Sequence, residues 1–174
     1  MKNNIALIGF MGTGKTAVSS EIARISGRKL INIDSIIEQR AGKSISHIFE
    51  QDGEIAFREI EIEVVKEIAE DNNQVIDCGG GVVLNWVNIQ RLKNNAVIVL
   101  LTADINEIIN RTGTANERPL LRSGDLENRI EDLLKFRMPF YERAADLIVD
   151  TTGLEAAQVA EKVIGELKKY AIAD

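Results

Sequence analysis

Short, largely apolar runs alternate along the chain with longer segments in which apolar residues recur every three or four positions. The apolar runs are typical of buried strands and cover residues 4–8, 30–33, 74–78, 96–101 and 147–149. The periodic segments predict helices over residues 15–26, 35–40, 45–51, 54–70, 86–92, 105–111, 126–137 and 154–170. Strands of this kind, separated by helices, imply a parallel sheet that is covered on both faces.

The pattern therefore predicts one α/β domain over residues 1–174, without an internal repeat or a linker. Two helices have an apolar face that we expect to contact the core. These faces comprise Val18, Ile22 and Ile25 in the first helix, and Ile55, Ile62, Val65 and Ala69 in the long fourth one. Residues 112–125 have no periodicity and contain glycine and proline, so they are the candidate for a mobile lid.

Composition narrows the class of protein. With 45% hydrophobic and 28% charged residues the chain is globular, and no apolar run approaches the roughly 18–20 residues of a membrane span. Residues 1–4 lead directly into the first strand, so we expect no signal peptide. The single cysteine, Cys78, excludes an internal disulfide and favours the cytoplasm. We assign Cys78 and the single histidine, His47, to structural roles.

The net charge of −6 argues against general nucleic-acid binding, which normally requires a basic excess. An anionic ligand would therefore need specific arginine and lysine side chains that converge against the overall field of the molecule. We therefore expect any anionic ligand at one of the few places where cationic side chains accompany glycine-rich segments.

The segment Gly9-Phe10-Met11-Gly12-Thr13-Gly14-Lys15-Thr16 matches the phosphate-binding pattern G-x-x-x-x-G-K-[ST]. Its glycines permit positive φ and remove side chains that would block a phosphate, so backbone N–H groups can form an anion nest. Lys15 would bind the β- and γ-phosphates, and Thr16 would bind Mg²⁺. A glycine-rich turn without a ligand is the alternative, but the motif follows a predicted strand and opens a predicted helix. The predicted nucleotide-binding residues here are Gly12, Thr13, Gly14, Lys15, Thr16 and Ala17.

Further candidate residues lie near the ends of the predicted strands. Asp34 follows the second strand, Gly79–Gly81 follow the third, and Arg58 lies on the helix between them. Arg137 precedes Pro139, which we expect to break its helix. Ligands of open α/β sheets bind at the carboxyl ends of the strands, so these residues could line one pocket beside the glycine-lysine loop.

Taken together, these motifs resemble those of the shikimate kinases over essentially the whole chain. The resemblance is carried by the loop at residues 9–16 and by "INIDSIIE", "DGEIAFREIE", "CGGGVV", "ERPLL" and "RMPFYERAAD". It implies a P-loop kinase with a five-stranded parallel sheet of order 2-3-1-4-5, flanked by helices. It also implies transfer of the γ-phosphate of ATP to the 3-hydroxyl of shikimate, with Mg²⁺, in aromatic amino acid biosynthesis.

The resemblance assigns Arg58 and Arg137 to the shikimate carboxylate, which a guanidinium can bind bidentately. Asp34, in a substrate-binding region at about residues 33–61, would hydrogen-bond ring hydroxyls and orient or deprotonate the attacking one. The glycine run would let backbone amides approach the substrate. The remaining assignments concern ATP: Lys15 and Arg118 would stabilise the transferred phosphoryl group, with Arg118 in the lid, and Arg111 would lie near the adenine.

Each of these residues also has a plain structural alternative. Asp34 could cap the helix that follows it, and Arg58 could pair with a neighbouring glutamate, Glu54 or Glu61. Arg137 could stabilise the dipole of a helix end. The glycine run could be a turn alone, and the arginine of the lid could be an ordinary surface residue.

One position departs from the family pattern. Shikimate kinases usually carry an acid two positions before Asp34 that helps to hold Mg²⁺ through water, and this chain has Asn32 there. An amide oxygen can accept a hydrogen bond from a metal-bound water but carries no charge, so Thr16 and the phosphates would hold most of the ion. Asp77 stands near the end of the third strand, where a small or polar residue is usual, and we hypothesise that it compensates.

Two other functions remain open from the sequence. Another small-molecule kinase, such as a gluconate kinase, would share the loop but has no reason to keep both arginines and the glycine run. A non-catalytic nucleotide-binding module is the second, although Lys15, Thr16, Asp34 and Arg118 argue against it. The expected partners are ATP and shikimate, without nucleic acid or membrane, and a cytoplasmic monomer is the default because no heptad seam stands out.

Overall fold

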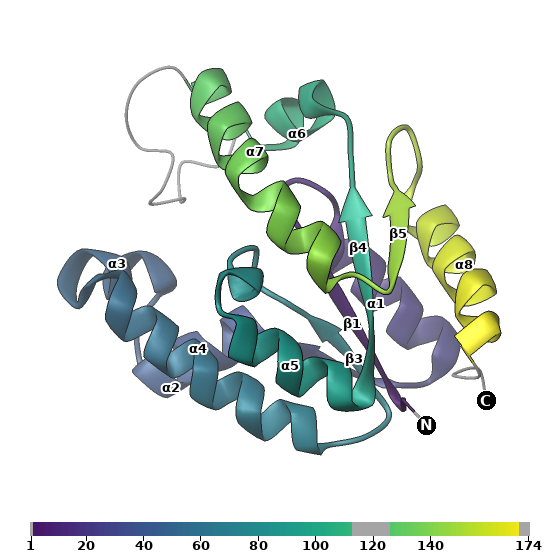
Figure 1. The fold of residues 1–174 in the computed structure, drawn as a ribbon, viewed down its shortest axis with the longest axis horizontal. Helices are drawn as coiled ribbons and strands as arrows, with labels where there is room; N and C mark the ends of the chain where they lie inside the picture. Colours follow the sequence, from purple (N-terminus) through teal and green to yellow (C-terminus); the bar gives the residue numbers. More distant parts are fainter. Residues whose placement is uncertain (1, 113–125, 171–174) are drawn as a thin grey trace.

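A five-stranded parallel sheet forms the centre of the molecule (Figure 1). The computed structural model describes residues 2–112 and 126–170, and its strands stand in the order β2-β3-β1-β4-β5. Their bounds are Asn4–Gly9 (β1), Lys29–Asn32 (β2), Gln74–Asp77 (β3), Ala96–Thr102 (β4) and Leu147–Asp150 (β5). All neighbouring strands pair in parallel. The predicted α/β class and strand order are therefore confirmed.

Helices cover both faces of this sheet (Figure 1). Their bounds are Lys15–Ser26 (α1), Ile33–Ala41 (α2), Ile45–Gln51 (α3), Gly53–Glu70 (α4), Trp86–Asn95 (α5), Ile105–Thr112 (α6), Leu126–Ala144 (α7) and Ala156–Leu167 (α8). Ile5 and Leu7 of β1 pack with α1 and α8 on one face, whereas Ala6 and Ile8 pack with α4, α5 and α7 on the other. Because successive strand residues point to opposite faces, a strand buried on both sides reads as one apolar run.

The apolar faces predicted for α1 and α4 are partly wrong. Ile25 is 43% exposed and Ile55 is 78% exposed, whereas Val18, Ile22 and Val65 are buried as expected. The true buried stripe of α4 is Phe57, Glu61, Val64, Val65 and Ile68. Sequence periodicity missed this stripe because it contains a carboxylate, and a count of apolar positions cannot place a charged residue inside.

Pro139 does not end its helix, contrary to the prediction. α7 continues to Ala144, with Pro139 inside it and exposed to solvent. Pro removes one backbone donor and disfavours a helix interior. On the side that faces the sheet, however, Ile130, Tyr141 and Ala144 are fully buried, and this packing holds both halves of the helix. Tertiary contacts therefore override the local preference.

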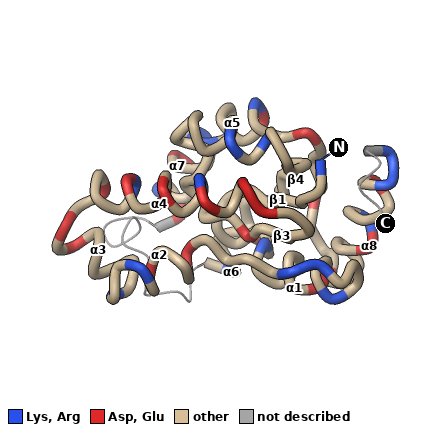
Figure 2. The backbone as a smooth tube through the Cα atoms, turned by 90° about the horizontal axis from the view of Figure 1, so that it is seen from below, with Lys and Arg blue, Asp and Glu red and all other residues tan. Residues whose placement is uncertain are grey.

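Acidic and basic residues are interspersed on the helices in the described part of the chain (Figure 2). None of the helices described in residues 2–112 and 126–170 is both long and apolar enough to span a membrane. Short 3₁₀ turns at Val82–Leu84 and Lys168–Tyr170 follow the glycine run and α8. The predicted lid, residues 112–125, lies outside the described residues except for Thr112, which ends α6.

Candidate active site

A cavity of about 1050 Å³ opens beside the carboxyl ends of β1, β2 and β3. Its wall is built by the loop between β1 and α1, by α2, α3 and α4, and by the glycine run after β3. The predicted site residues that line it are Gly12, Gly14, Lys15, Thr16, Ala17, Asp34, Arg58, Gly79, Gly80, Gly81, Arg111 and Arg137. Residues from distant parts of the sequence thus meet in one cavity, which the plain structural alternatives do not require.

Of the predicted site residues that the structure describes, Thr13 does not line this cavity. The Thr13 side chain is buried, and its hydroxyl donates a hydrogen bond of 2.8 Å to the carbonyl of Phe10. The carbonyl of Thr13 in turn accepts a hydrogen bond from the Thr151 hydroxyl. Thr13 therefore stabilises the loop through hydrogen bonds within the protein. Arg118 lies outside the described residues.

The glycine-lysine loop has a conformation that only glycine adopts easily. Gly12 and Gly14 have φ of 78° and 85°, in the left-handed region. A Cβ atom on Gly12 would also stand 2.9 Å from Oγ1 of Thr112, so this position has no room for a side chain. Lys15, which ends this loop, is the first residue of α1. The helix N-terminus and the Lys15 ammonium group therefore both favour an anion at this position.

Lys15 and Arg111 both contact the carbonyl groups of this loop. The ammonium of Lys15 donates to the Phe10 carbonyl at 3.1 Å. The guanidinium of Arg111 donates to the Gly12 carbonyl at 3.1 Å and forms an ion pair with Glu107 at 2.8 Å. Both cations thus stand at the end of the cavity that the glycine-lysine loop forms.

Arg58 is held on the opposite wall by two glutamates. Its Nη1 donates to both carboxylate oxygens of Glu61 at 3.0 Å, and its Nη2 donates to Glu54 at 3.1 Å. The pairing of Arg58 with Glu54 or Glu61, which the sequence offered as the plain alternative, is therefore present, but the Glu61 side chain has no solvent exposure. Burial raises the pKa of Glu61, although Arg58 opposes the shift. Glu61 is therefore a residue of the cavity wall, whereas the sequence offered it only as a pairing partner of Arg58.

Arg137 lies in the interior of α7 and not at a helix end, so the helix-dipole alternative is wrong. Its side chain is 4% exposed and reaches the cavity. Nη1 donates to the Gly80 carbonyl at 3.3 Å, and Nε is buried without a hydrogen-bond partner in the described part of the chain. The Tyr141 hydroxyl donates to the same carbonyl, and burial raises the pKa of Tyr141 to about 12. Tyr141 was also missed from the sequence.

The glycine run is explained by the side chains that lie against it. A Cβ atom on Gly79 would stand 2.5 Å from Oδ1 of Asp34, and one on Gly81 would stand 2.8 Å from Cζ of Arg58. By contrast, a Cβ atom on Gly80 would meet nothing nearer than 3.7 Å. Two of the three glycines thus make room for two of the predicted substrate-binding side chains.

Asp34 does not cap the helix in which it lies. The cap of α2 is Asn32, whose side-chain oxygen accepts from the backbone N–H of Ser35 at 2.8 Å, and α2 begins at Ile33. Asp34 lies in the first turn and lines the cavity. Burial raises its pKa, the Lys15 ammonium opposes the shift, and the Asp77 carboxylate adds to it.

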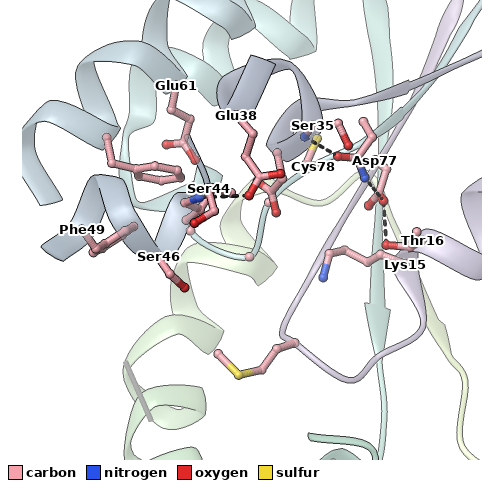
Figure 3. A pocket seen from close by; sticks show the side chains of 18 of the residues that line it. Lys15, Thr16, Ser35, Glu38, Ser44, Ser46, Phe49, Glu61, Asp77 and Cys78 are labelled. Atoms are coloured by element: carbon pink, nitrogen blue, oxygen red, sulfur yellow. Dashed lines mark hydrogen bonds between the residues drawn. The ribbon is translucent and has the colours of Figure 1, made fainter. Parts of the chain in front are cut away.

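A hydrogen-bonded chain joins the loop to the ends of β2 and β3. Oδ2 of Asp77 accepts from the Thr16 hydroxyl at 2.8 Å and from Nδ2 of Asn32 at 2.8 Å. Figure 3 shows Thr16 and Asp77 pointing toward one another at the side of the cavity where Lys15 lies. In the described residues, no cluster of three or more His, Cys, Asp or Glu side chains could hold a metal ion.

Three features define a P-loop phosphotransferase: the sheet order, the glycine-lysine loop, and the Arg58 and Arg137 guanidinium groups on the opposite wall of the cavity. The family model described as shikimate kinase matches residues 11–168. The chain therefore belongs to the shikimate kinase family, and it is an ATP-dependent phosphotransferase with shikimate kinase activity.

Similar proteins of known sequence and structure agree with this assignment. The shikimate kinase of Thermodesulfovibrio yellowstonii is 47% identical over 95% of each chain, and that of Pelotomaculum thermopropionicum is 44% identical over 96% of each. A structure of shikimate kinase from Acinetobacter baumannii, in complex with shikimate, has a TM-score of 0.93 with 33% identity, covering 98% of this chain and 95% of the other. A gluconokinase from Sinorhizobium meliloti shares the fold alone, with a TM-score of 0.59 and 14% identity over 97% of this chain and 93% of the other.

Proposed function

We propose that the cavity binds ATP and shikimate side by side and that the γ-phosphoryl group passes to the 3-hydroxyl of shikimate between them. The observation that carries this proposal is the presence of the Arg58 and Arg137 guanidinium groups in the same cavity as the glycine-lysine loop. A nucleotide site alone has no need for two further guanidinium groups beyond the phosphates. A carboxylated acceptor does, because each group can orient a carboxylate.

The loop would hold the phosphates of ATP. Backbone N–H groups at the start of α1 form the cradle, and Lys15 exchanges its hydrogen bond with the Phe10 carbonyl for the β- and γ-phosphates. Mg²⁺, when bound with ATP, would neutralise charge on the phosphate oxygens. Thr16 fits such an ion because its hydroxyl proton is directed to Asp77, which leaves the oxygen lone pairs for a cation.

The opposite wall would hold shikimate. Arg137 lines the cavity, and its Nη1 is already held by the Gly80 carbonyl, so its guanidinium is positioned to donate to a carboxylate oxygen. Arg58, fixed by Glu61, supplies the second guanidinium. Two such contacts fix the orientation of the ring, which is the main requirement of phosphoryl transfer.

Asp34 lies between the two halves of the cavity, against Gly79 and within the field of Lys15. From there it would accept a hydrogen bond from the attacking hydroxyl of shikimate and orient it toward the phosphate. Its raised pKa makes the carboxylate a better proton acceptor than an exposed aspartate. We therefore assign two roles to Asp34: it orients the attacking hydroxyl and accepts its proton.

Release of ADP, measured with and without an acceptor, tests this proposal. We expect ATP consumption to require shikimate and to stay at background with gluconate. Lys15→Ala should lower kcat by at least about a hundredfold with a small change in the KM for shikimate. The matched variant Arg58→Ala should raise the KM for shikimate at least about tenfold and leave nucleotide affinity unchanged. A normal shikimate KM in Arg58→Ala would overturn the assignment of that wall.

A further inference from the structure

Asp77 is a buried carboxylate beside the glycine-lysine loop that does not itself contact ATP or shikimate in the proposed phosphoryl transfer. It is 4% exposed and lines the cavity as the last residue of β3. In the sheet register its Cα partner is Asn32, the last residue of β2. Burying an ionised carboxylate is costly unless it is paired or coordinates a cation, so its position calls for an explanation.

The hydrogen bond from Thr16 to Asp77 determines how the Thr16 hydroxyl is oriented. A hydroxyl has one proton and two lone pairs. With the proton donated to Oδ2 of Asp77 at 2.8 Å, the lone pairs of Thr16 point elsewhere and can be offered to a cation. Partners that orient a metal ligand in this way commonly change metal affinity by about 10–100-fold. Asp77 is thus placed to prepare Thr16 for a divalent ion.

Asn32 cannot supply the charge that such a site prefers. Both ends of its amide are used within the fold: the oxygen caps α2 through the N–H of Ser35, and the nitrogen donates to Asp77. Mg²⁺ is usually held by one or two carboxylates together with phosphate oxygens and water. At this edge of the sheet the carboxylate therefore stands on β3, and the residue opposite it on β2 is a neutral donor.

We propose that Asp77 is the protein carboxylate of the Mg²⁺ site in this chain, acting as a positioning residue that orients the Thr16 hydroxyl and adds negative charge beside the ion. Asn32 serves as its support, because its amide holds the same carboxylate oxygen in place. The inference rests on the proposed function for the presence of a nucleotide with Mg²⁺, but it does not depend on the identity of the acceptor.

The plain alternative is that Asp77 only ties β2, β3 and α1 together. Asp77→Asn separates the two roles, because an asparagine oxygen can still accept both hydrogen bonds while the charge is lost. The Asn32→Asp, Asp77→Asn double variant returns one carboxylate to the same edge, on the neighbouring strand. Its net charge is that of the natural chain.

Calorimetric titration of ADP at a series of Mg²⁺ concentrations provides a measurement that needs no turnover. The quantity compared is the Mg²⁺ concentration that gives half of the metal-dependent gain in ADP affinity. We expect Asp77→Asn to raise this concentration by about tenfold or more, with unchanged ADP affinity in the absence of metal. The double variant should recover most of this loss, and Asn32→Asp alone should lower the Mg²⁺ requirement. Asp34→Asn is the matched control, because the Asp34 carboxylate lines the cavity but does not accept a hydrogen bond from Thr16. This variant should change the Mg²⁺ requirement much less.

An unchanged Mg²⁺ requirement in Asp77→Asn, or an equal loss in Asp34→Asn, would overturn the inference. If Asp77→Asn fails to fold, the comparison of Asn32→Asp with the double variant decides, since identical Mg²⁺ curves for these two would exclude a contribution from Asp77. Failure of the proposed function would appear elsewhere, as ADP release by the natural chain that does not respond to shikimate. The two failures can therefore be told apart.

Discussion

Nη1 of Arg58 donates hydrogen bonds of 3.0 Å to both carboxylate oxygens of Glu61, a side chain with no solvent exposure. Nη2 of the same arginine donates to Glu54, whose side chain is 50% exposed. One guanidinium thus joins a buried partner and an exposed one. The buried pair lies in low dielectric and resists screening, whereas an exposed pair contributes little.

We predict from this difference that Glu61→Gln raises the KM for shikimate about tenfold and that Glu54→Gln changes it by less than about threefold. Loss of a charged, buried hydrogen bond costs about 1.5–3 kcal/mol, and an exposed pair at i,i+4 costs about 0.3–0.5 kcal/mol. Steady-state kinetics with varied shikimate at saturating ATP provide the measurement. Equal effects of the two variants would show that Glu61 does not position Arg58.

The raised pKa of Glu61 predicts a pH dependence of stability. The folded chain retains the Glu61 proton to a higher pH than the unfolded chain does, where the ordinary value is 4.5. Wild-type stability therefore falls, relative to Glu61→Gln, as the pH rises from about 4.5 through the pKa of the folded state. Denaturant unfolding of both proteins from pH 4 to pH 8 provides the measurement. As the pH rises, the free energy of unfolding of Glu61→Gln should increase relative to that of wild type, and the difference should then become constant. A difference that is constant throughout would contradict the shift.

The glycine run provides three matched substitutions that we expect to behave differently. Gly81→Ala places a methyl group against the Arg58 guanidinium and should raise the KM for shikimate at least about tenfold. Gly79→Ala places one against Asp34 and should lower kcat. Gly80→Ala has room, with its nearest neighbour at 3.7 Å, and should leave the melting temperature within about 2 °C of wild type.

Kinetics and thermal unfolding of the three variants, measured in parallel, test this explanation of the run. If Gly80→Ala raised the shikimate KM as much as Gly81→Ala without loss of stability, close approach of the substrate to the backbone would be the better explanation. That result would favour the prediction made from the sequence, in which the glycines serve the ligand and not the neighbouring side chains.

The parts of the molecule that the sequence predicted well are those encoded by contiguous residues. The predicted bounds of α1 and α3 agree with the observed Lys15–Ser26 and Ile45–Gln51. The glycine-lysine loop was recognisable because its pattern fits within eight positions and its flanking strand and helix are strongly periodic. Local sequence was therefore sufficient to predict these two helices and the end of the cavity that the glycine-lysine loop forms.

The parts that were missed depend on contacts between distant segments. Glu61 lies within an otherwise apolar stripe, and its inward position follows from Arg58 and from Asn88 of α5, whose side-chain nitrogen lies 3.4 Å from it. Tyr141 became a site residue only because α7 continues through Pro139 and brings its hydroxyl to the Gly80 carbonyl. Periodicity treats a carboxylate as solvent-facing and a proline as a helix end, so neither position could be recovered from pattern alone.

Arg137 has two roles, one toward the Gly80 carbonyl and one toward the substrate, and Arg137→Lys separates them. An ammonium group can still donate to the Gly80 carbonyl, but it is a single point charge and cannot reproduce the second direction of a guanidinium fork. We therefore expect near-normal stability, unchanged nucleotide affinity and a KM for shikimate raised at least about tenfold. Tyr141→Phe is the control for the shared carbonyl: it should lower the free energy of unfolding by about 1 kcal/mol and change the KM only a few-fold. Arg137→Lys with a normal KM would mean that the Arg137 guanidinium does not bind the substrate carboxylate, because the forked geometry lost in this variant is the one that a carboxylate requires.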